Sequence, residues 1–531
     1  MNQAEIKRRQ TEEIAGILTL VMIFVMGKRM ETGGITYMSA AVYVCFLAGA
    51  LASGGLADTL GKMLRSRRNK GQYKNILTLR KSALLFQGIL GLACAAALVL
   101  LACAAAEGVF RIRYCTFLIM ALSPVVLLRT VSAVLQGYFQ GEAAELPRAF
   151  SGIARQLLTL GFGLLFTGML GDYGEKVSSL LREPEFAPMY RCLGLCLAIC
   201  LAEVLVILFL AVLFKGSRRR ERRMQQEGVH AGDSAWDCIR NLCMGRWSHS
   251  AAIILGILPL AVGLALSGRG NPEEAGALLQ YDIYVERYFA VCCGLVFVLS
   301  FLALPVTGKV FQSLRREEGR LARTVFLGGV HMGVVQGVFF SVFAAVMGTR
   351  ISACLGGDGG ELAGQMLRAG SSVVALVSLS LYFGRFLQGV GKKYMLPCAL
   401  CLSDAAFLLL LFITVKSGIL SLVYAGVVLA LVLCGTLGFL SFRQLRIRMD
   451  WLGMLVIPLL AGGAAGLVCM LSDRLFSTVM GDLPILLVSF LFSGIVYLAL
   501  LLVLRNFREQ EFEILPGGRI LNKIGQMLHR Y

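Results

Sequence analysis

Charged residues are scarce in this chain: Asp, Glu, Lys and Arg make up only 16% of its 531 residues. Hydrophobic residues make up 57%, and the mean hydropathy is +0.74. A soluble core does not need so many apolar residues, and the apolar runs repeatedly reach the roughly 20 residues that cross a bilayer. The composition therefore predicts an integral membrane protein.

Several signals of other protein classes are absent from the sequence. The glycine-rich stretch 356–360 lacks the Lys-Ser/Thr ending of a phosphate-binding loop, and no ATPase motif occurs elsewhere. Residues 1–11 are polar and no small-residue cleavage site follows the first apolar run, so we expect this run to stay as an anchor. Cys398 and Cys401 form a CxxC pair without a second pair or a His partner. The 16 Cys are expected to act as small hydrophobic residues, and no metal or redox cofactor is predicted.

The apolar runs predict an all-α protein with fourteen transmembrane helices. We place them near residues 12–29, 36–57, 83–105, 115–137, 149–170, 190–214, 249–267, 287–307, 324–348, 369–388, 396–415, 419–441, 452–472 and 484–505.

The distribution of basic residues predicts the topology. With a cytoplasmic N-terminus, most of the 51 Lys and Arg fall in cytoplasmic segments, as the positive-inside rule requires. An even number of spans then makes both termini cytoplasmic. The net charge of +19 is explained by this bias, so no nucleic-acid binding is expected. Anionic lipids of the inner leaflet are the expected partners of the basic loops.

An internal repeat divides the chain. The segment Leu135-Gln136-Gly137 with Leu146-Pro147 returns as Leu387-Gln388-Gly389 with Leu396-Pro397, and Gly61-Lys62 and Gln87-Gly88 return as Gly308-Lys309 and Gln336-Gly337. Six spans per copy give both copies the same orientation in the membrane, as in transporters that move two related halves about a central site. Pro147 and Pro397 are expected in the first turn of a helix.

The repeat predicts five segments. They are an N-lobe at 1–214 (spans one to six), a basic cytosolic linker at 215–248, a C-lobe at 249–441 (spans seven to twelve), spans thirteen and fourteen at 442–505, and a cytosolic tail at 506–531.

Two arginines lie inside predicted spans. Arg129 precedes the cytoplasmic end of span four by eight residues, and Arg155 follows Pro147 by eight, so each lies roughly 12 Å deep. Charges at this depth are expensive and are often functional, and guanidinium groups bind phosphate through paired hydrogen bonds. We predict that both arginines bind a diphosphate. The alternatives are that they extend to the inner interface or form a structural ion pair.

Two carboxylates also lie inside predicted spans. Glu203, near the middle of span six, must be paired, protonated or cavity-lining. Asp404 in span eleven could bind Na⁺ or H⁺ and couple transport to an ion gradient, or could neutralise an arginine across the lobe interface and latch one state.

Other polar residues near the membrane give weaker predictions. Glu286 and Arg287, at the outer start of span eight, could gate the outward opening or could form a solvated patch with Asp282. Arg385 is expected to be structural, and His331 is expected to be satisfied by local contacts.

The motif Gly137-Tyr138-Phe139-Gln140-Gly141, with Pro147 after it, resembles that of the stage V sporulation protein B group. The segment from Ser53 to Tyr73 is similar to the part of that group that follows the second span. The group belongs to the multidrug/oligosaccharidyl-lipid/polysaccharide (MOP) exporter superfamily, which includes MurJ-type flippases. The resemblance implies a MATE-like fold. This chain departs from the pattern at Gly55-Leu56-Ala57, which lacks the usual proline, and at Gln136, which replaces an arginine.

The resemblance implies a transporter of the bacterial plasma membrane, not an enzyme. It would flip undecaprenyl-diphosphate-linked oligosaccharides, such as lipid II or a surface polysaccharide unit, from the inner to the outer leaflet by alternating access. A Na⁺ or H⁺ gradient or the membrane potential would drive it, without a cofactor, and a monomer is expected.

Two alternative functions stay open. A MATE-like antiporter of cationic drugs would need an acidic, aromatic-lined cavity. A polysaccharide polymerase or ligase would need a large external loop with catalytic residues, whereas the outer segments near 171–189, 268–286 and 349–368 are short and contain no His.

Overall fold

The computed structural model describes residues 3–30, 33–112, 114–142, 144, 146–224, 234–267, 275–356, 359–414, 418–447, 452–478, 480–504, 506 and 507. Within these residues the regular structure is helical, without β-strands. Fourteen helices are long and apolar enough to cross a membrane, and each overlaps one of the predicted spans. The all-α, multi-pass membrane architecture is therefore confirmed.

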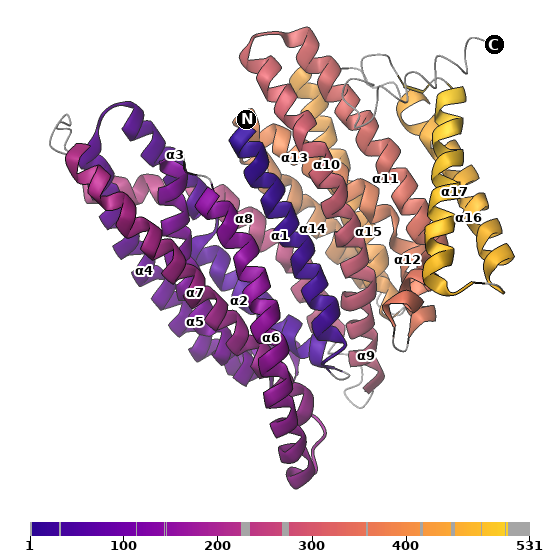
Figure 1. The fold of residues 1–531 in the computed structure, drawn as a ribbon, viewed down its shortest axis with the longest axis horizontal. Helices are drawn as coiled ribbons and strands as arrows, with labels where there is room; N and C mark the ends of the chain where they lie inside the picture. The colour runs from indigo at the N-terminus through magenta and orange to yellow at the C-terminus, as the bar shows by residue number, and fades with distance from the viewer. Residues whose placement is uncertain are drawn as a thin grey trace. The chain divides into compact units, whose positions relative to one another are not determined.

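The first compact unit, which we call the N-unit, comprises Lys7–Asp282. Its helices are α1 (Gln3–Gly27, from Lys7 on), α2 (Gly34–Ser53), α3 (Leu56–Asn69), α4 (Tyr73–Cys103), η1 (Ala104–Phe110), α5 (Cys115–Gly141), α6 (Leu146–Leu181), α7 (Phe186–Met224), α8 (Ala235–Ser267) and most of α9 (Ala275–Ile283). Helices α6 and α7 run side by side as a long hairpin (Figure 1).

The second compact unit, the C-unit, comprises Met1–Ile6 and Ile283–Tyr531. Its helices are η2 (Tyr284–Phe289), α10 (Ala290–Arg315), α11 (Gly319–Leu355), α12 (Gly360–Gly370), α13 (Ser372–Gly389), α14 (Met395–Thr414), α15 (Leu420–Leu445), η4 (Leu452–Val456), α16 (Ile457–Phe476) and α17 (Asp482–Val503). A core of aromatic and branched side chains around Phe326 and Phe386 joins α10, α11, α13 and α15.

The boundary between the units differs from the predicted boundary between the lobes. Span seven was expected to open a C-lobe at residue 249 after a linker at 215–248, but α8 begins at Ala235 and packs on α2, α3 and α4 of the N-unit. Arg246 of α8 donates hydrogen bonds to the carbonyl oxygens of Leu51 (2.8 Å) and Ala52 (2.6 Å). These carbonyls belong to the last turn of α2, which has no intrahelical donors for them. The repeat thus marks the two copies but does not predict that the first helix of the second copy, α8, packs with the first copy.

Helices α3 and α5 approach closely because glycines line their contact. A Cβ atom on Gly141 would lie 2.5 Å from Leu64 Cβ, and one on Gly137 would lie 3.0 Å from the carbonyl oxygen of Ala57. A Cβ atom on Gly61 would in turn lie 2.9 Å from the side chain of Gln140. The glycines of the GYFQG motif therefore serve helix packing.

The structure also fixes the register of the repeat. Both α5 and α13 end on a glycine that follows a glutamine, Gly141 and Gly389. Gly141 faces Leu64, three residues after Gly61, and Gly389 faces Phe311, three residues after Gly308. The equivalent peptides are therefore 138–141 and 386–389, which pairs Gln388 with Gln140 and not with Gln136. Pro147 and Pro397 lie in the first turns of α6 and α14, as predicted.

The last two membrane helices pack on α11 within the C-unit, as Figure 1 shows. Arg350 of α11 forms ion pairs with Asp473 of α16 (2.9 Å) and Asp482 of α17 (2.7 Å). Tyr497 of α17 donates a hydrogen bond to the carbonyl oxygen of Val335 (2.8 Å). Spans thirteen and fourteen are therefore fastened to span nine.

Candidate functional site

Three charged side chains from three helices meet in the N-unit. Glu203 of α7 is fully buried, and its Oε1 atom lies 2.9 Å from Nε of Arg129 on α5 and 2.8 Å from Nε of Arg155 on α6. The two arginines were predicted at matching depth and Glu203 was predicted to be paired, protonated or cavity-lining. The structure brings all three together, with Glu203 paired to both arginines.

The cluster keeps part of its hydrogen-bonding capacity open. Arg129 is 32% exposed and Arg155 is 21% exposed. The guanidinium carbon of Arg129 lies 5.0 Å from the ring centre of Phe46, a cation–π contact. Nη2 of Arg155 donates to Ser132 Oγ at 3.3 Å, while the structure shows no protein acceptor for either Nη atom of Arg129 among the described residues. With two guanidiniums on one carboxylate, the cluster carries a net charge of +1, so it can accept an anion.

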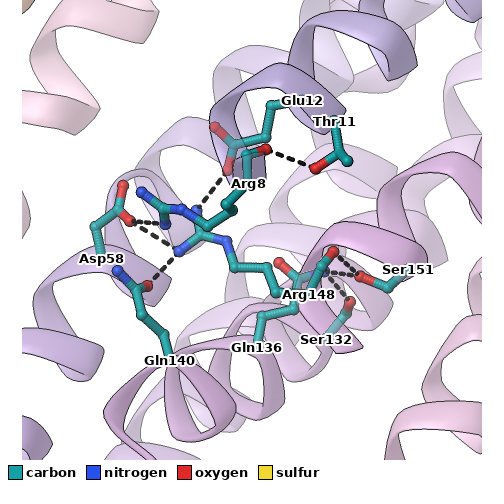
Figure 2. Close-up of polar contacts among 9 residues, drawn as sticks. All are labelled: Arg8, Thr11, Glu12, Asp58, Ser132, Gln136, Gln140, Arg148 and Ser151. Carbon is teal, nitrogen blue, oxygen red and sulfur yellow. Dashed lines mark hydrogen bonds and ion pairs between the residues drawn. The ribbon is translucent and has the colours of Figure 1, made fainter. Parts of the chain in front are cut away.

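A second ion cluster lies where α5 turns into α6, and Figure 2 shows it. Oδ1 of Asp58 on α3 accepts from Arg8 of α1 (3.0 Å) and from Arg148 of α6 (2.8 Å). Arg148 also forms an ion pair with Glu12 of α1 (3.3 Å) and donates to the side-chain oxygen of Gln140. Arg8, Glu12, Asp58 and Arg148 were not predicted as site residues. Arg8, Asp58 and Arg148 lie outside the predicted spans, and Glu12 is the first residue of the span at 12–29.

Polar side chains connect the two clusters. Gln136 of α5 donates to Ser132 (3.3 Å) and to Ser151 of α6 (3.2 Å), and Ser151 donates to the carbonyl oxygen of Arg148 (Figure 2). Ser132 in turn accepts from Arg155. The polar residues recur three or four positions apart, which places them on one face of each helix. They are 129, 132, 136 and 140 on α5, and 148, 151 and 155 on α6. We call this set the polar stripe.

The motif residues outside the stripe hold the helices in place. Tyr138 is buried, and its hydroxyl donates to Glu142 (2.8 Å). Its ring packs edge-on against Phe214 of α7 at 4.7 Å, with the guanidinium of Arg80 over both rings. Phe139 is buried in the same core, which joins α3, α4, α5 and α7. Apart from Gln140, the GYFQG motif is thus a packing element in this structure.

Asp404 lies on α14 of the C-unit and is only 4% exposed. Neither of its carboxylate oxygens has a hydrogen-bond partner among the described residues. Burying an ionised carboxylate without a partner is costly, so Asp404 needs a proton, a cation or a partner that comes with a change of state. Both predicted roles, ion coupling and latch, require such an incomplete environment.

The residues at the start of span eight take structural positions. Asp282 accepts from the backbone N–H groups of Gly33 (2.5 Å) and Thr36 (2.8 Å) and so caps α2. Arg287 is 4% exposed and donates to Ser352 Oγ (3.2 Å) and to the carbonyl oxygen of Gly356 (2.7 Å), at the end of α11. These contacts are those of helix termini, and a gate formed by Glu286 and Arg287 stays a prediction.

His331 makes the local contacts that were expected. Its Nε2 atom lies 2.9 Å from Nδ2 of Asn506, and its ring lies 5.7 Å from the ring of Phe507. Arg385 is half-buried in the last turns of α13. Among the described residues, no group of three or more His, Cys, Asp or Glu side chains could hold a metal ion.

Comparison with known structures first defines the class: the chain has the fold of the multi-helix membrane transporters of the MOP superfamily. It superimposes on an inward-facing multidrug resistance MATE family transporter with a TM-score of 0.60 and 12% identity, over 84% of this chain and 98% of that one. It superimposes on the lipid II flippase MurJ in an inward closed conformation with a TM-score of 0.64 and 10% identity, over 93% and 98% of the two chains.

The sequence comparison gives a more particular relative. The chain is 24% identical over 205 residues to the stage V sporulation protein B of Bacillus subtilis (strain 168), which is 38% of this chain and only 37% of that protein. No protein-family model matches the chain. The predicted resemblance to the MOP superfamily, of the MurJ type, is confirmed.

Proposed function

We propose that this protein is a secondary-type transporter that flips an oligosaccharide linked to undecaprenyl diphosphate from the inner to the outer leaflet of the bacterial plasma membrane. The observation that carries the proposal is the cluster of Arg129, Arg155 and Glu203. It places two guanidiniums and one carboxylate within a membrane-spanning bundle.

The chemistry of the cluster suits a diphosphate. Guanidinium groups form short, charge-assisted and often bidentate hydrogen bonds with phosphate oxygens. Glu203 holds both arginines through their Nε atoms, so the cluster stays assembled when no substrate is bound. The Nη atoms of Arg129 then offer donors to a phosphate, and the net charge of +1 favours an anion over a cation.

The fold supports transport by alternating access. The two compact units carry the same sequence motifs in the same register, although α8 of the second copy packs in the N-unit. Internal repeats of this kind are typical of transporters that rock two halves about a central site. The similarity to the lipid II flippase MurJ covers more of this chain than the similarity to the MATE transporter, 93% against 84%. The polyprenyl chain would stay in the lipid phase. We expect cytoplasmic termini and a monomer, with anionic lipids at the basic loops.

Asp404 is proposed to couple the movement to an ion. Its buried oxygens lack partners in the described part of the C-unit, so binding of H⁺ or Na⁺ would relieve the cost of the buried charge. The ion would favour the state in which Asp404 is neutralised, and a gradient across the membrane would then drive the cycle.

The alternative within the same fold is export of a cationic drug. A cation would be repelled by the net positive cluster around Arg129 and would need an acidic site instead. A polymerase or ligase on the same lipid carriers is the alternative from another class. It would require catalytic side chains in the outer segments and would consume the lipid-linked sugar without moving it.

Complementation tests the proposal. The protein is expected to rescue a bacterium depleted of its lipid II flippase or its surface-polysaccharide flippase, and Arg129→Gln is expected to lose rescue while remaining in the membrane. Lys70→Gln is the matched control, because Lys70 is an exposed basic residue at the end of α3. Equal rescue by Arg129→Gln and Lys70→Gln would reject the cluster as the substrate site. Absence of rescue by the unaltered protein in both strains, with drug export present, would favour the antiporter.

A further inference from the structure

We propose that Arg148 forms a first, cytoplasmic binding site for the phosphates of the lipid substrate, and that Glu12 of α1 occupies this site in place of a phosphate when it is empty. The inference rests on the proposed function, because it assigns a step that precedes binding at Arg129 and Arg155. The ligand chemistry is that of a diphosphate group, esterified in the substrate by the polyprenyl chain on one phosphate and by the sugar on the other.

The site repeats the arrangement of the deeper cluster. Arg8 and Arg148 share Oδ1 of Asp58, as Arg129 and Arg155 share Oε1 of Glu203. Each site thus pairs two guanidiniums with one carboxylate oxygen. Arg148 is only 13% exposed. A buried charge of this kind is held by the acceptors around it, so the acceptors decide whether a ligand can enter.

The two sites lie on one continuous face. Arg148 and Arg155 are seven residues apart on α6, which is two turns or about 10 Å. Ser151 lies between them and, with Gln136 and Ser132 of α5, forms the hydrogen-bonded part of the polar stripe. Ser132 and Ser151 are themselves buried, so the polar stripe connects the two arginines through hydrogen bonds within the interface of α5 and α6.

Of the three side chains that accept from Arg148, only Glu12 is suited to leave. Asp58 is tied to Arg8 as well, and Gln140 is packed against Gly61. Glu12 is 48% exposed, and its distance to Arg148, 3.3 Å, is longer than that of Asp58, 2.8 Å. A half-exposed carboxylate at this distance is the weakest of the contacts, and a phosphate offers the same charge with more acceptor oxygens.

Glu12 also connects α1 to α6. Figure 2 shows Arg8 and Glu12 reaching from α1 toward Asp58 and Arg148. Most described residues of α1 are not buried, so polar contacts contribute a large share of its attachment in the N-unit. Displacement of Glu12 by a phosphate would remove one of these contacts and would link substrate capture to the release of α1 from α6.

The proposal is tested by measuring the affinity of the purified full-length protein for undecaprenyl diphosphate in detergent. Two variants are expected to change this affinity in opposite directions. Glu12→Gln removes the competing carboxylate and is expected to tighten binding by roughly twofold to fivefold, the range of a half-exposed ion pair. Arg148→Gln is expected to weaken binding by roughly tenfold or more. The double variant should match Arg148→Gln, and Lys70→Gln should match the unaltered protein.

Additional variants and a competition experiment distinguish the possible negative results. Arg148→Lys keeps a charge beside Asp58 and is expected to bind between the unaltered protein and Arg148→Gln, which controls for a folding defect. Inorganic pyrophosphate should compete with the lipid if the headgroup alone is recognised, and full resistance to pyrophosphate would mean that the site is not a phosphate site. If Glu12→Gln binds undecaprenyl diphosphate with unchanged or weaker affinity, Glu12 does not occupy the phosphate site. Retained binding by Arg148→Gln with loss of rescue by Arg129→Gln overturns this inference alone, whereas no diphosphate binding by the unaltered protein overturns the proposed function.

Discussion

Arg148 lies seven residues before Arg155 on the same face of α6, and each binds a carboxylate oxygen that also accepts from an arginine of another helix. The two arrangements solve one physical problem, since a guanidinium within a membrane bundle needs a counter-charge that does not saturate it. At Glu203, one carboxylate for two guanidiniums leaves one positive charge. At Asp58 the same charge is left only when Glu12 leaves Arg148. The polar stripe therefore combines a stable resting structure with affinity for anions.

Glu203→Gln is expected to destabilise the protein. The amide cannot neutralise Arg129 and Arg155, so two half-buried guanidiniums lose the fully buried counter-charge between them. Removing one partner of a buried ion pair costs about 3 kcal/mol or more. The free energy of unfolding in detergent, measured at constant protein and detergent concentration, should fall accordingly.

The matched control for Glu203→Gln is Glu175→Gln. Glu175 is 57% exposed and pairs with Arg191, so its replacement should cost less than about 1 kcal/mol. The double variant Glu203→Gln with Arg155→Gln should recover part of the loss, because one uncompensated charge is removed. Equal stability of Glu203→Gln and Glu175→Gln would show that Glu203 does not hold the arginines.

Asp404→Asn is expected to abolish the dependence of transport on an ion gradient without loss of stability. The amide resembles the neutralised carboxyl group and avoids the cost of an unpartnered buried charge. Flipping in proteoliposomes under separate Na⁺ and pH gradients should become insensitive to the gradient that drives the unaltered protein.

The control for Asp404→Asn is Asp473→Asn, which changes the same chemical group in the same unit. Asp473 pairs with Arg350 and is 36% exposed, so its replacement should leave the gradient dependence intact. If Asp404→Asn responds to both gradients as the unaltered protein does, only a latch role stays possible for Asp404.

The membrane spans could be predicted from the sequence because length and hydrophobicity are local properties. Residue counts along their helices also predicted that Arg129 and Arg155 lie at the same level, and both reach Oε1 of Glu203. Their common partner could not be chosen, since the sequence gives the depth of Glu203 but not the rotation of α7 or its neighbours. The pairing belongs to tertiary packing.

Two other features of the structure could not be predicted from local sequence patterns. The cluster at Asp58 joins three helices from distant parts of the chain. Its charges lie outside the predicted spans, except for Glu12 at the first residue of span 12–29. The sequence feature that could have indicated this cluster is the spacing of polar residues on α6. Positions 148, 151 and 155 are three and four residues apart, so Arg148 and Ser151 share one helix face with Arg155. The position of α8 in the N-unit was also not predictable from the repeat. The repeat shows that two segments share an origin, whereas the position of α8 depends on tertiary contacts such as that of Arg246 with the carbonyl oxygen of Ala52.

Gly141→Ala is expected to destabilise the N-unit because its Cβ would lie 2.5 Å from Leu64 Cβ, at a site where α3 and α5 are held together by the packing of Leu60 and Tyr138. Overpacking of this kind costs about 1–3 kcal/mol. The control is Gly88→Ala on α4, where a Cβ would meet nothing within 4 Å. That change should be neutral or stabilising by up to about 1 kcal/mol, since alanine favours the helix. Thermal unfolding in detergent measures both variants. A drop for both would indicate a general sensitivity to helix substitutions, whereas a drop for Gly141→Ala alone would establish that the motif glycine is required for the close approach of the two helices.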